Sequence, residues 1–245
     1  MKYSRQETIN KVNIELANIE LLYKANCVNW KGTTNDSNEQ YTEVIAEELL
    51  LNLKAFSGIT PVTRTSSYCR DSHCNIEIDI CHSNRDEENF AKRITGLELE
   101  NLGLIKDFQI PLKDTLGDKG LGKIDLISYN KDIKTLYLIE LKYIGNSETL
   151  LRASLESYTY YKIVDGIKLI NDFINNKQFI LNQVFNSVNP AEIIIKPAVL
   201  LVPGCNAYEE LNEMNRSIRP MLKALVLALG VNFFTLEFFV NEHLL

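Results

Sequence analysis

The 245-residue sequence predicts an α/β fold with a mixed central sheet, preceded by an α-rich N-terminal region. Three observations indicate this class. Apolar residues recur at helical spacing in the first 56 residues, two alternating apolar runs flank a polar turn at 130–134, and strand-like runs alternate with helical ones after residue 145. Residues 1–83 are predicted to form a helical region with a short β segment, and residues 84–245 to form the core.

The N-terminal region contains two predicted amphipathic helices, at 4–23 and 40–56. Val12 and Leu16 are typical of the helical spacing of apolar residues in the first. Isoleucines then alternate with polar residues at 76–81, which predicts a strand or hairpin.

The core is predicted to begin with a helix from Ser83 to about Leu102. Ser83 and Asp86 resemble a capping box with the shorter acid, and Gly103 suits the position just past a helix end. Alternating apolar residues at 104–112 then predict the first core strand.

A β-hairpin follows. Ile124–Tyr129 and Leu136–Tyr143 are apolar runs rich in β-branched and aromatic residues, and the polar Asn130–Lys134 lies between them as a turn. If Asn130 pairs with Thr135, the register of the whole hairpin is determined.

In that register Asp125 lies directly opposite Glu140, and Lys142 projects from the same face as Glu140. Two opposed carboxylates repel each other, and a divalent cation would compensate for the repulsion. Lys142 could hold a proton, orient an attacking water or stabilise charge on a phosphate. The alternative is a solvated hairpin face on which Lys142 pairs with the acids.

Helices and strands alternate after the hairpin. Asn146 or Ser147 is the predicted N-cap of the next helix, and Pro220 predicts a kink or a split in a later helical stretch. The remaining elements are a helix at 148–163, a strand at 192–202, a helical stretch at 208–229 and a strand at 231–240.

Gly122–Asp125 followed by Ile139–Lys142 resembles the PD-(D/E)xK nuclease superfamily, which has the restriction-endonuclease-like fold. The Glu-x-Lys half of the motif is intact. The first half departs from the literal motif, because Lys123 and Ile124 precede Asp125 where a proline could stand. The resemblance implies a three-layer sandwich with a mixed central sheet.

The resemblance also implies a metal-dependent phosphodiesterase site. Asp125 and Glu140 would bind Mg²⁺ or Mn²⁺, the backbone carbonyl of Leu141 would add a ligand, and Lys142 would position or activate water. Nucleases of this superfamily often carry a further glutamate on the helix before the core strands.

Glu88 is the favoured residue for this additional role, ahead of Glu87. Both acids are also explained by a favourable interaction of the first helical turn with the helix dipole. On the helix after Glu-x-Lys, Glu156 and Tyr160 match residue types that approach the site in such nucleases. Arg152 is a candidate phosphate contact, or else a partner of neighbouring glutamates.

The composition limits the choice of partners. The net charge is −6, with 26 basic and 32 acidic residues, so no global basic field collects nucleic acid. A local patch would be needed to bind phosphates, and the candidates are Lys106, Lys113, Lys119 and Lys123.

No apolar run approaches the roughly 20 residues that span a bilayer, and the N-terminus lacks the apolar segment of a signal peptide. A cytoplasmic location without a membrane partner is expected.

The five cysteines argue against a disulfide framework because their number is odd. Cys69, Cys74 and Cys81 lie near His73 and His82, so zinc is one interpretation. Reduced thiols are favoured, since no close Cys-x-x-Cys pair is present.

The expected function is a metal-dependent nuclease that hydrolyses phosphodiester bonds, with DNA preferred to RNA and Mg²⁺ (or Mn²⁺) as cofactor. Its predicted catalytic residues are Asp125, Glu140, Lys142 and Glu88. A homodimer would let one site per chain cut both strands. Two alternatives stay open: a protein of nuclease fold that binds nucleic acid or a partner without cutting, and a protein that acts on a small nucleotide.

Overall fold

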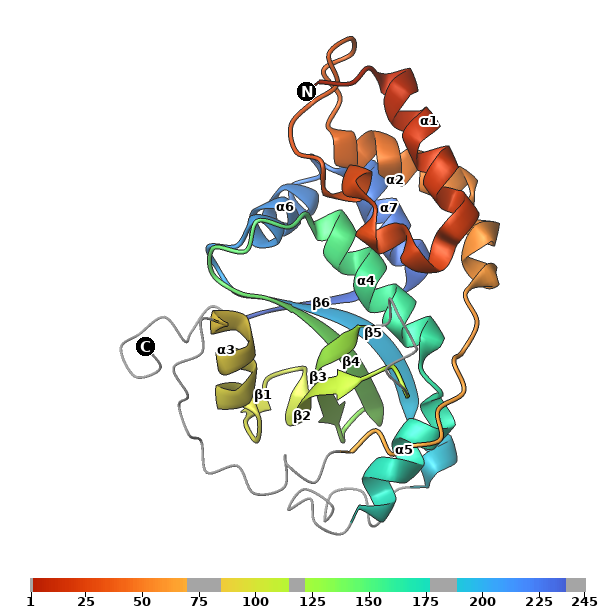
Figure 1. Cartoon of the computed structure of the whole chain (residues 1–245). Helices are drawn as coiled ribbons and strands as arrows, with labels where there is room; N and C mark the ends of the chain where they lie inside the picture. The colour runs from red at the N-terminus through yellow and green to blue at the C-terminus, as the bar shows by residue number, and fades with distance from the viewer. Residues whose placement is uncertain (1, 70–84, 115–121, 177–188, 237–245) are drawn as a thin grey trace.

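A six-stranded sheet lies at the centre of the part of the chain that the structure describes (Figure 1). The computed structural model describes residues 2–69, 85–114, 122–176 and 189–236. Neighbouring strands from β1 to β4 are antiparallel, whereas β4, β5 and β6 run parallel. The strands are β1 (Glu98–Leu99), β2 (Gly103–Pro111), β3 (Lys123–Asn130), β4 (Thr135–Lys142), β5 (Ile194–Leu201) and β6 (Asn232–Thr235). The predicted α/β class with a mixed sheet is confirmed.

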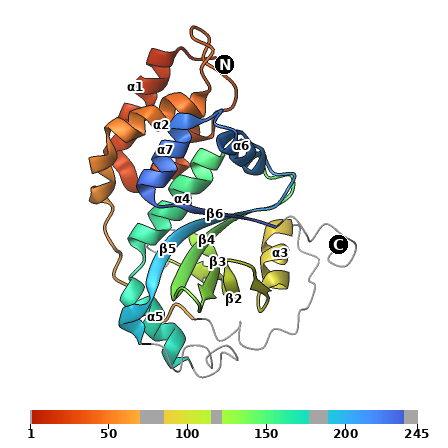
Figure 2. The ribbon, with the colours of Figure 1, turned by 180° about the vertical axis from the view of Figure 1, so that it is seen from behind.

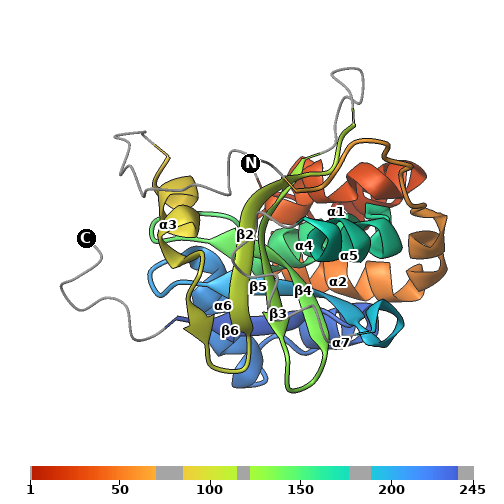
Figure 3. The same cartoon turned by 90° about the horizontal axis from the view of Figure 1, so that it is seen from below.

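Helices cover both faces of this sheet (Figure 3). Helix α3 packs on one face, and α4 and α5 pack on the other. Helices α1, α2 and α7 lie beyond α4, with α2 beside α7 (Figure 2). The α-helices are α1 (Arg5–Glu15), α2 (Tyr41–Leu51), α3 (Asp86–Ile94), α4 (Leu150–Ile163), α5 (Gly166–Asn175), α6 (Asn206–Asn215) and α7 (Pro220–Leu229). Short 3₁₀ segments are Leu16–Lys24, Asn26–Asn29, Leu53–Gly58 and Pro190–Glu192.

Two hydrophobic cores lie on the two faces of the sheet. The smaller core joins α3, through Phe90 and Ile94, to β2, β3, β4 and β5. The larger core contains Leu22 of the N-terminal region together with Leu155 of α4 and Leu225 of α7. The N-terminal helices therefore share one core with the C-terminal half, and the predicted boundary at residue 83 falls outside the described residues.

The predicted hairpin register is confirmed. Asn130 pairs with Thr135, and Leu126 pairs with Ile139. The side chain of Asn130 accepts a hydrogen bond from the backbone N–H of Asp132, which closes the turn locally. The recorded ladder stops at Leu126, one residue before Asp125.

Two predicted helix boundaries are wrong. Helix α3 ends at Ile94 rather than near Leu102: Thr95 is already extended, with ψ 131°, and Gly96 follows with φ 90° before β1. The N-cap of α4 is Thr149, not Asn146 or Ser147.

Other predicted elements agree with the structure or lie beyond it. Pro220 splits the predicted helical stretch into α6 and α7, and it occupies the first turn of α7. The predicted strand at 76–81, the capping residue Ser83 and the end of the last strand lie outside the described residues. Among the described helices, none combines the length and the apolar character that a membrane span requires.

Candidate functional site between strand β4 and helix α4

Strand β4 directs two charged side chains toward α4. Leu138 belongs to the larger core, whereas Ile139 and Leu141 belong to the smaller one, so Glu140 and Lys142 continue the face that α4 covers. The Nζ atom of Lys142 donates to Oε1 of Glu140 at 2.7 Å, and both side chains are buried. The predicted common face of these two residues is confirmed.

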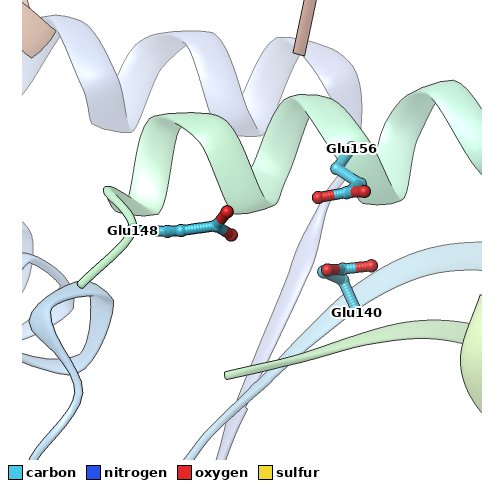
Figure 4. A group of neighbouring side chains, drawn as sticks. All are labelled: Glu140, Glu148 and Glu156. Atoms are coloured by element: carbon cyan, nitrogen blue, oxygen red, sulfur yellow. The ribbon is translucent and has the colours of Figure 1, made fainter. Parts of the chain in front are cut away.

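Two further glutamates reach the same place from α4 and the residue just before its cap (Figure 4). The Nζ atom of Lys142 lies 2.5 Å from Oε2 of Glu148 and 3.9 Å from Oε2 of Glu156. Glu140, Glu148 and Glu156 each offer a carboxylate oxygen within 4.8 Å of the others. The Lys142 ammonium thus lies among three carboxylates.

Asp125 of β3 adjoins this group from the side. Its Oδ2 accepts the backbone N–H of Leu141 at 3.0 Å, and its Oδ1 accepts Nε2 of Gln109 at 3.0 Å. Asp125 is half-buried, so it lies nearer to solvent than Glu140. The recorded contact of Leu141 with this site is its N–H; its predicted role as a carbonyl ligand stays a prediction.

Burial and neighbouring charges shift the pKa values of Glu140, Asp125 and Lys142. Burial raises the pKa of Glu140 well above its usual value, and the charges of Asp125 and Glu156 raise it further. Burial also raises the pKa of Asp125 to about 7, although Lys142 and the N–H of Leu141 oppose the shift. Burial alone would lower the pKa of Lys142, but the surrounding carboxylates outweigh it and raise that pKa well above its usual value. Lys142 therefore stays an ammonium, and two of the acids bind protons readily.

Two tyrosines extend the site toward the N-terminal region. The hydroxyl of Tyr160 donates to Oε1 of Glu156 at 2.7 Å. Its ring contacts Tyr23 edge-on, with centroids 5.6 Å apart. Burial raises the pKa of Tyr23 to about 12, so this phenol stays neutral at physiological pH. The predicted approach of Glu156 and Tyr160 to the site agrees with this geometry.

The two glutamates of α3 occupy different surroundings. Glu88 forms ion pairs with Arg85 and Lys92, close to its own helix. Glu87 accepts the backbone N–H of Tyr143 at 3.1 Å, just after β4, and its charge raises the pKa of Asp125. The preference for Glu88 is thus corrected: Glu87 lies on the site side of the first helical turn.

The remaining candidates are Arg152 and the lysines of the predicted basic patch. Arg152 pairs with Glu148 at 3.1 Å, which is the alternative expected for it. Lys106 is buried, and burial lowers its pKa to about 8, so it does not belong to a surface patch. Lys119 lies outside the described residues. The prediction that Lys106 belongs to a basic surface patch is therefore wrong.

Cys69 is buried in the larger core, where burial raises the pKa of its thiol to about 12. Cys69 is a free thiol, as the favoured reduced state predicts. Cys74, Cys81 and the two nearby histidines lie outside the described residues.

The donor set fits a hard divalent cation. The carboxylates of Glu140, Glu148 and Glu156 converge on Lys142, and Arg152 pairs with Glu148 at the rim. With Asp125 beside them, carboxylates outnumber cationic groups among these residues. Carboxylate oxygens on rigid elements suit Mg²⁺ or Mn²⁺. Two oxygens bound to one such ion can be at most about 4.2 Å apart, so glutamates spread over 4.8 Å need to move only a little.

Sequence reasoning had missed two of the contributors. Glu148 is one of the glutamates near Arg152 in the sequence, and its place in the site follows from the extended backbone of the cap Thr149, which precedes α4. Gln109 carries no motif, and its place opposite Asp125 follows only from the β2–β3 pairing.

Comparison with known proteins gives no assignment for this chain. No family model, no curated protein and no solved structure matches it.

Proposed function

We propose that this protein is a metal-dependent nuclease that hydrolyses phosphodiester bonds with Mg²⁺ or Mn²⁺, and that DNA is preferred to RNA. One observation carries the proposal: Glu140, Glu148 and Glu156 converge on a buried lysine, with Asp125 beside them, at the end of β4. Such an arrangement costs folding energy unless a cation or protons offset the excess negative charge. The resemblance of the hairpin to the PD-(D/E)xK pattern supports the same reaction.

Asp125 and Glu140 would hold the metal ion, with Glu148 and Glu156 as further carboxylates in reach of Glu140. Bound there, the ion would offset charge on the phosphate oxygens and lower the pKa of a bound water. Lys142 is held as an ammonium, so it would donate hydrogen bonds to the attacking water or to the phosphate rather than abstract a proton. The water would attack phosphorus in line with the leaving oxygen.

The exposed side of the site suits a polymeric substrate. Asp125, Glu148 and Arg152 are half-buried, whereas Glu140 and Lys142 lie beneath them. A phosphate approaching from solvent would thus meet the rim before the lysine. If both strands of a duplex are cut, a homodimer would supply the second site.

A second candidate is a protein of nuclease fold that binds nucleic acid or a partner without cutting. Its supporting observation is the burial of Glu140 and Lys142, which are only 5% and 3% exposed. In that case the group would be an internal ion network that holds α4 against β4.

Calorimetric titration of Mn²⁺ into the protein and into Glu140→Gln separates these functions. We expect the wild type to bind, and the variant to bind at least about tenfold more weakly, since even partners of metal ligands commonly matter that much. The control is Glu213→Gln, which changes a glutamate of α6 that pairs with Arg219. This variant should bind Mn²⁺ as the wild type does. If the wild type binds no Mn²⁺ even with duplex DNA present, the metal-dependent nuclease is excluded. The protein that binds without cutting then remains.

Cleavage assays then test the reaction itself. We expect Mg²⁺-dependent nicking of plasmid DNA that a chelator stops. Lys142→Met should abolish nicking while Mn²⁺ binding persists, because the methionine keeps the length of the side chain without its charge. Nicking by Lys142→Met at the wild-type rate would exclude the proposed role of Lys142.

A further inference from the structure

Gln109 has an unusual backbone for a residue in the middle of a strand. Its φ is 51°, in the left-handed region that favours glycine, although it lies within β2. Its neighbours Phe108 and Ile110 pair regularly with Leu126 and Ile124 of β3. The strain therefore belongs to one residue between two regular pairs of the ladder.

Strand β2 changes face at Gln109. Residues two apart in a regular strand share a face, yet Phe108 belongs to the smaller core and Ile110 to the larger one. The partner strand behaves in the same way, with Leu126 in the smaller core and Ile124 in the larger. The switch of faces thus falls at Gln109 and at Asp125, which lies between Ile124 and Leu126.

The side chain of Gln109 forms a hydrogen bond with Asp125 where the two strands change face. Its Nε2 atom donates to Oδ1 of Asp125 at 3.0 Å, while the other oxygen of Asp125 accepts the N–H of Leu141 at 3.0 Å. One donor on each oxygen determines the plane of the carboxylate. A glycine would adopt this backbone conformation without strain, but it would leave Oδ1 of Asp125 without this donor.

We propose that Gln109 is a positioning residue, which tolerates a strained backbone so that its amide can orient the Asp125 carboxylate toward a bound cation. This inference rests on the proposed metal site, and it adds a residue to that site from outside the hairpin. Gln109 itself binds neither metal nor substrate in this scheme.

Two variants separate the strain from the hydrogen bond. Gln109→Gly removes both, whereas Gln109→Met keeps the strained backbone and the side-chain length but removes the donor. Ser217→Gly is the matched control, since Ser217 also has a positive φ, of 62°, and is exposed between α6 and α7. For each protein we would measure the melting temperature, Mn²⁺ affinity by calorimetry, and hydrogen exchange of the Leu141 amide in metal-free protein by NMR.

We expect both Gln109 variants to bind Mn²⁺ about tenfold more weakly than the wild type, as is common when a hydrogen-bond partner of a metal ligand is lost. Both should also exchange the Leu141 amide faster, because Asp125 is free to rotate. Gln109→Gly should melt at a higher temperature than Gln109→Met, because the two differ in backbone strain and not in the lost donor. Ser217→Gly should melt at a higher temperature than the wild type and leave the other two measurements unchanged.

Each measurement can overturn a definite part of the proposal. Unchanged exchange of the Leu141 amide in Gln109→Met would show that Gln109 does not orient Asp125, whether or not metal binds. Wild-type Mn²⁺ affinity in both Gln109 variants would likewise overturn the positioning role. Equal melting temperatures of Gln109→Gly and Gln109→Met would refute the strain, because both lack the donor and only glycine relieves the backbone. If the wild type binds no Mn²⁺, the proposed function fails, and the exchange data still decide the role of Gln109.

Discussion

At the scale of single residues, Asp125 and Glu140 decide the charge of the site. Both have pKa values above the usual range for carboxyl groups because they are buried close to other acids. A carboxyl whose pKa is higher in the folded than in the unfolded protein binds its proton more tightly when folded. Its contribution to stability is fully present below the unfolded pKa and is lost as the pH rises through the folded pKa.

For Asp125 that loss falls between about pH 4 and about pH 7. We expect the melting temperature of the metal-free protein to fall over this range, and Asp125→Asn to reduce the fall. The asparagine can accept the Leu141 N–H and donate to Gln109 once the glutamine amide turns over, so both contacts survive. Melting curves in a chelator at several pH values measure this, and a variant less stable than the wild type at pH 7 would make Asp125 a structural residue.

At the level of helices and strands, α4 covers the site, and the N-terminal region forms hydrogen bonds with the cap of α4. The Thr149 hydroxyl donates to the carbonyl of Val28 at 2.6 Å, and it also accepts the N–H of Arg152 as the helix cap. The N–H of Thr149 donates to the side chain of Asn29 at 2.8 Å. The cap therefore fixes the position of Glu148, the residue before it, from outside the helix.

Thr149→Val tests this anchoring. Valine keeps the shape but loses the cap and the bond to Val28, so we expect a loss of about 1–2 kcal/mol in the free energy of unfolding by urea. Ser4→Ala removes the capping-box serine of α1 and should cost about 1 kcal/mol. Only Thr149→Val should also weaken Mn²⁺ binding. Equal effects of the two variants on Mn²⁺ binding would contradict a specific role for the α4 cap.

At the scale of the whole molecule, the N-terminal helices and the sheet behave as one packed body. Val12 and Tyr23 of the N-terminal region belong to the same core as Leu151 of α4 and Val226 of α7. Buried polar contacts add to this packing: Arg219, at the cap of α7, pairs with Glu210 of α6 and donates to Thr42 of α2. Removing the N-terminal helices would thus expose the core of α4.

The only tryptophan of the sequence, Trp30, gives a direct test of this unity. It stacks on Tyr3 with centroids 4.2 Å apart, so its fluorescence reports on the N-terminal region. We expect the urea midpoint from Trp30 fluorescence to coincide with the midpoint from far-UV circular dichroism, which reports on all helices and strands. A Trp30 transition at clearly lower urea would indicate an N-terminal unit that unfolds by itself.

Predictions from sequence succeeded where the information is local. The hairpin register follows from a polar turn between Asn130 and Thr135 and from the two-residue period of strands, so Glu140 and Lys142 could be assigned to one face. The end of α3 was missed because the apolar pattern continues past Gly96, while the backbone does not stay helical there.

The hairpin, the mixed α/β class and the common face of Glu140 and Lys142 follow from local sequence patterns. The meeting of Glu148 and Gln109 with these residues follows from the folded chain, because Glu148 lies just before the cap of α4 and Gln109 lies on β2. Their positions depend on how α4 packs on the sheet and on where β2 turns over, and both follow from the packing of the two cores rather than from any local pattern.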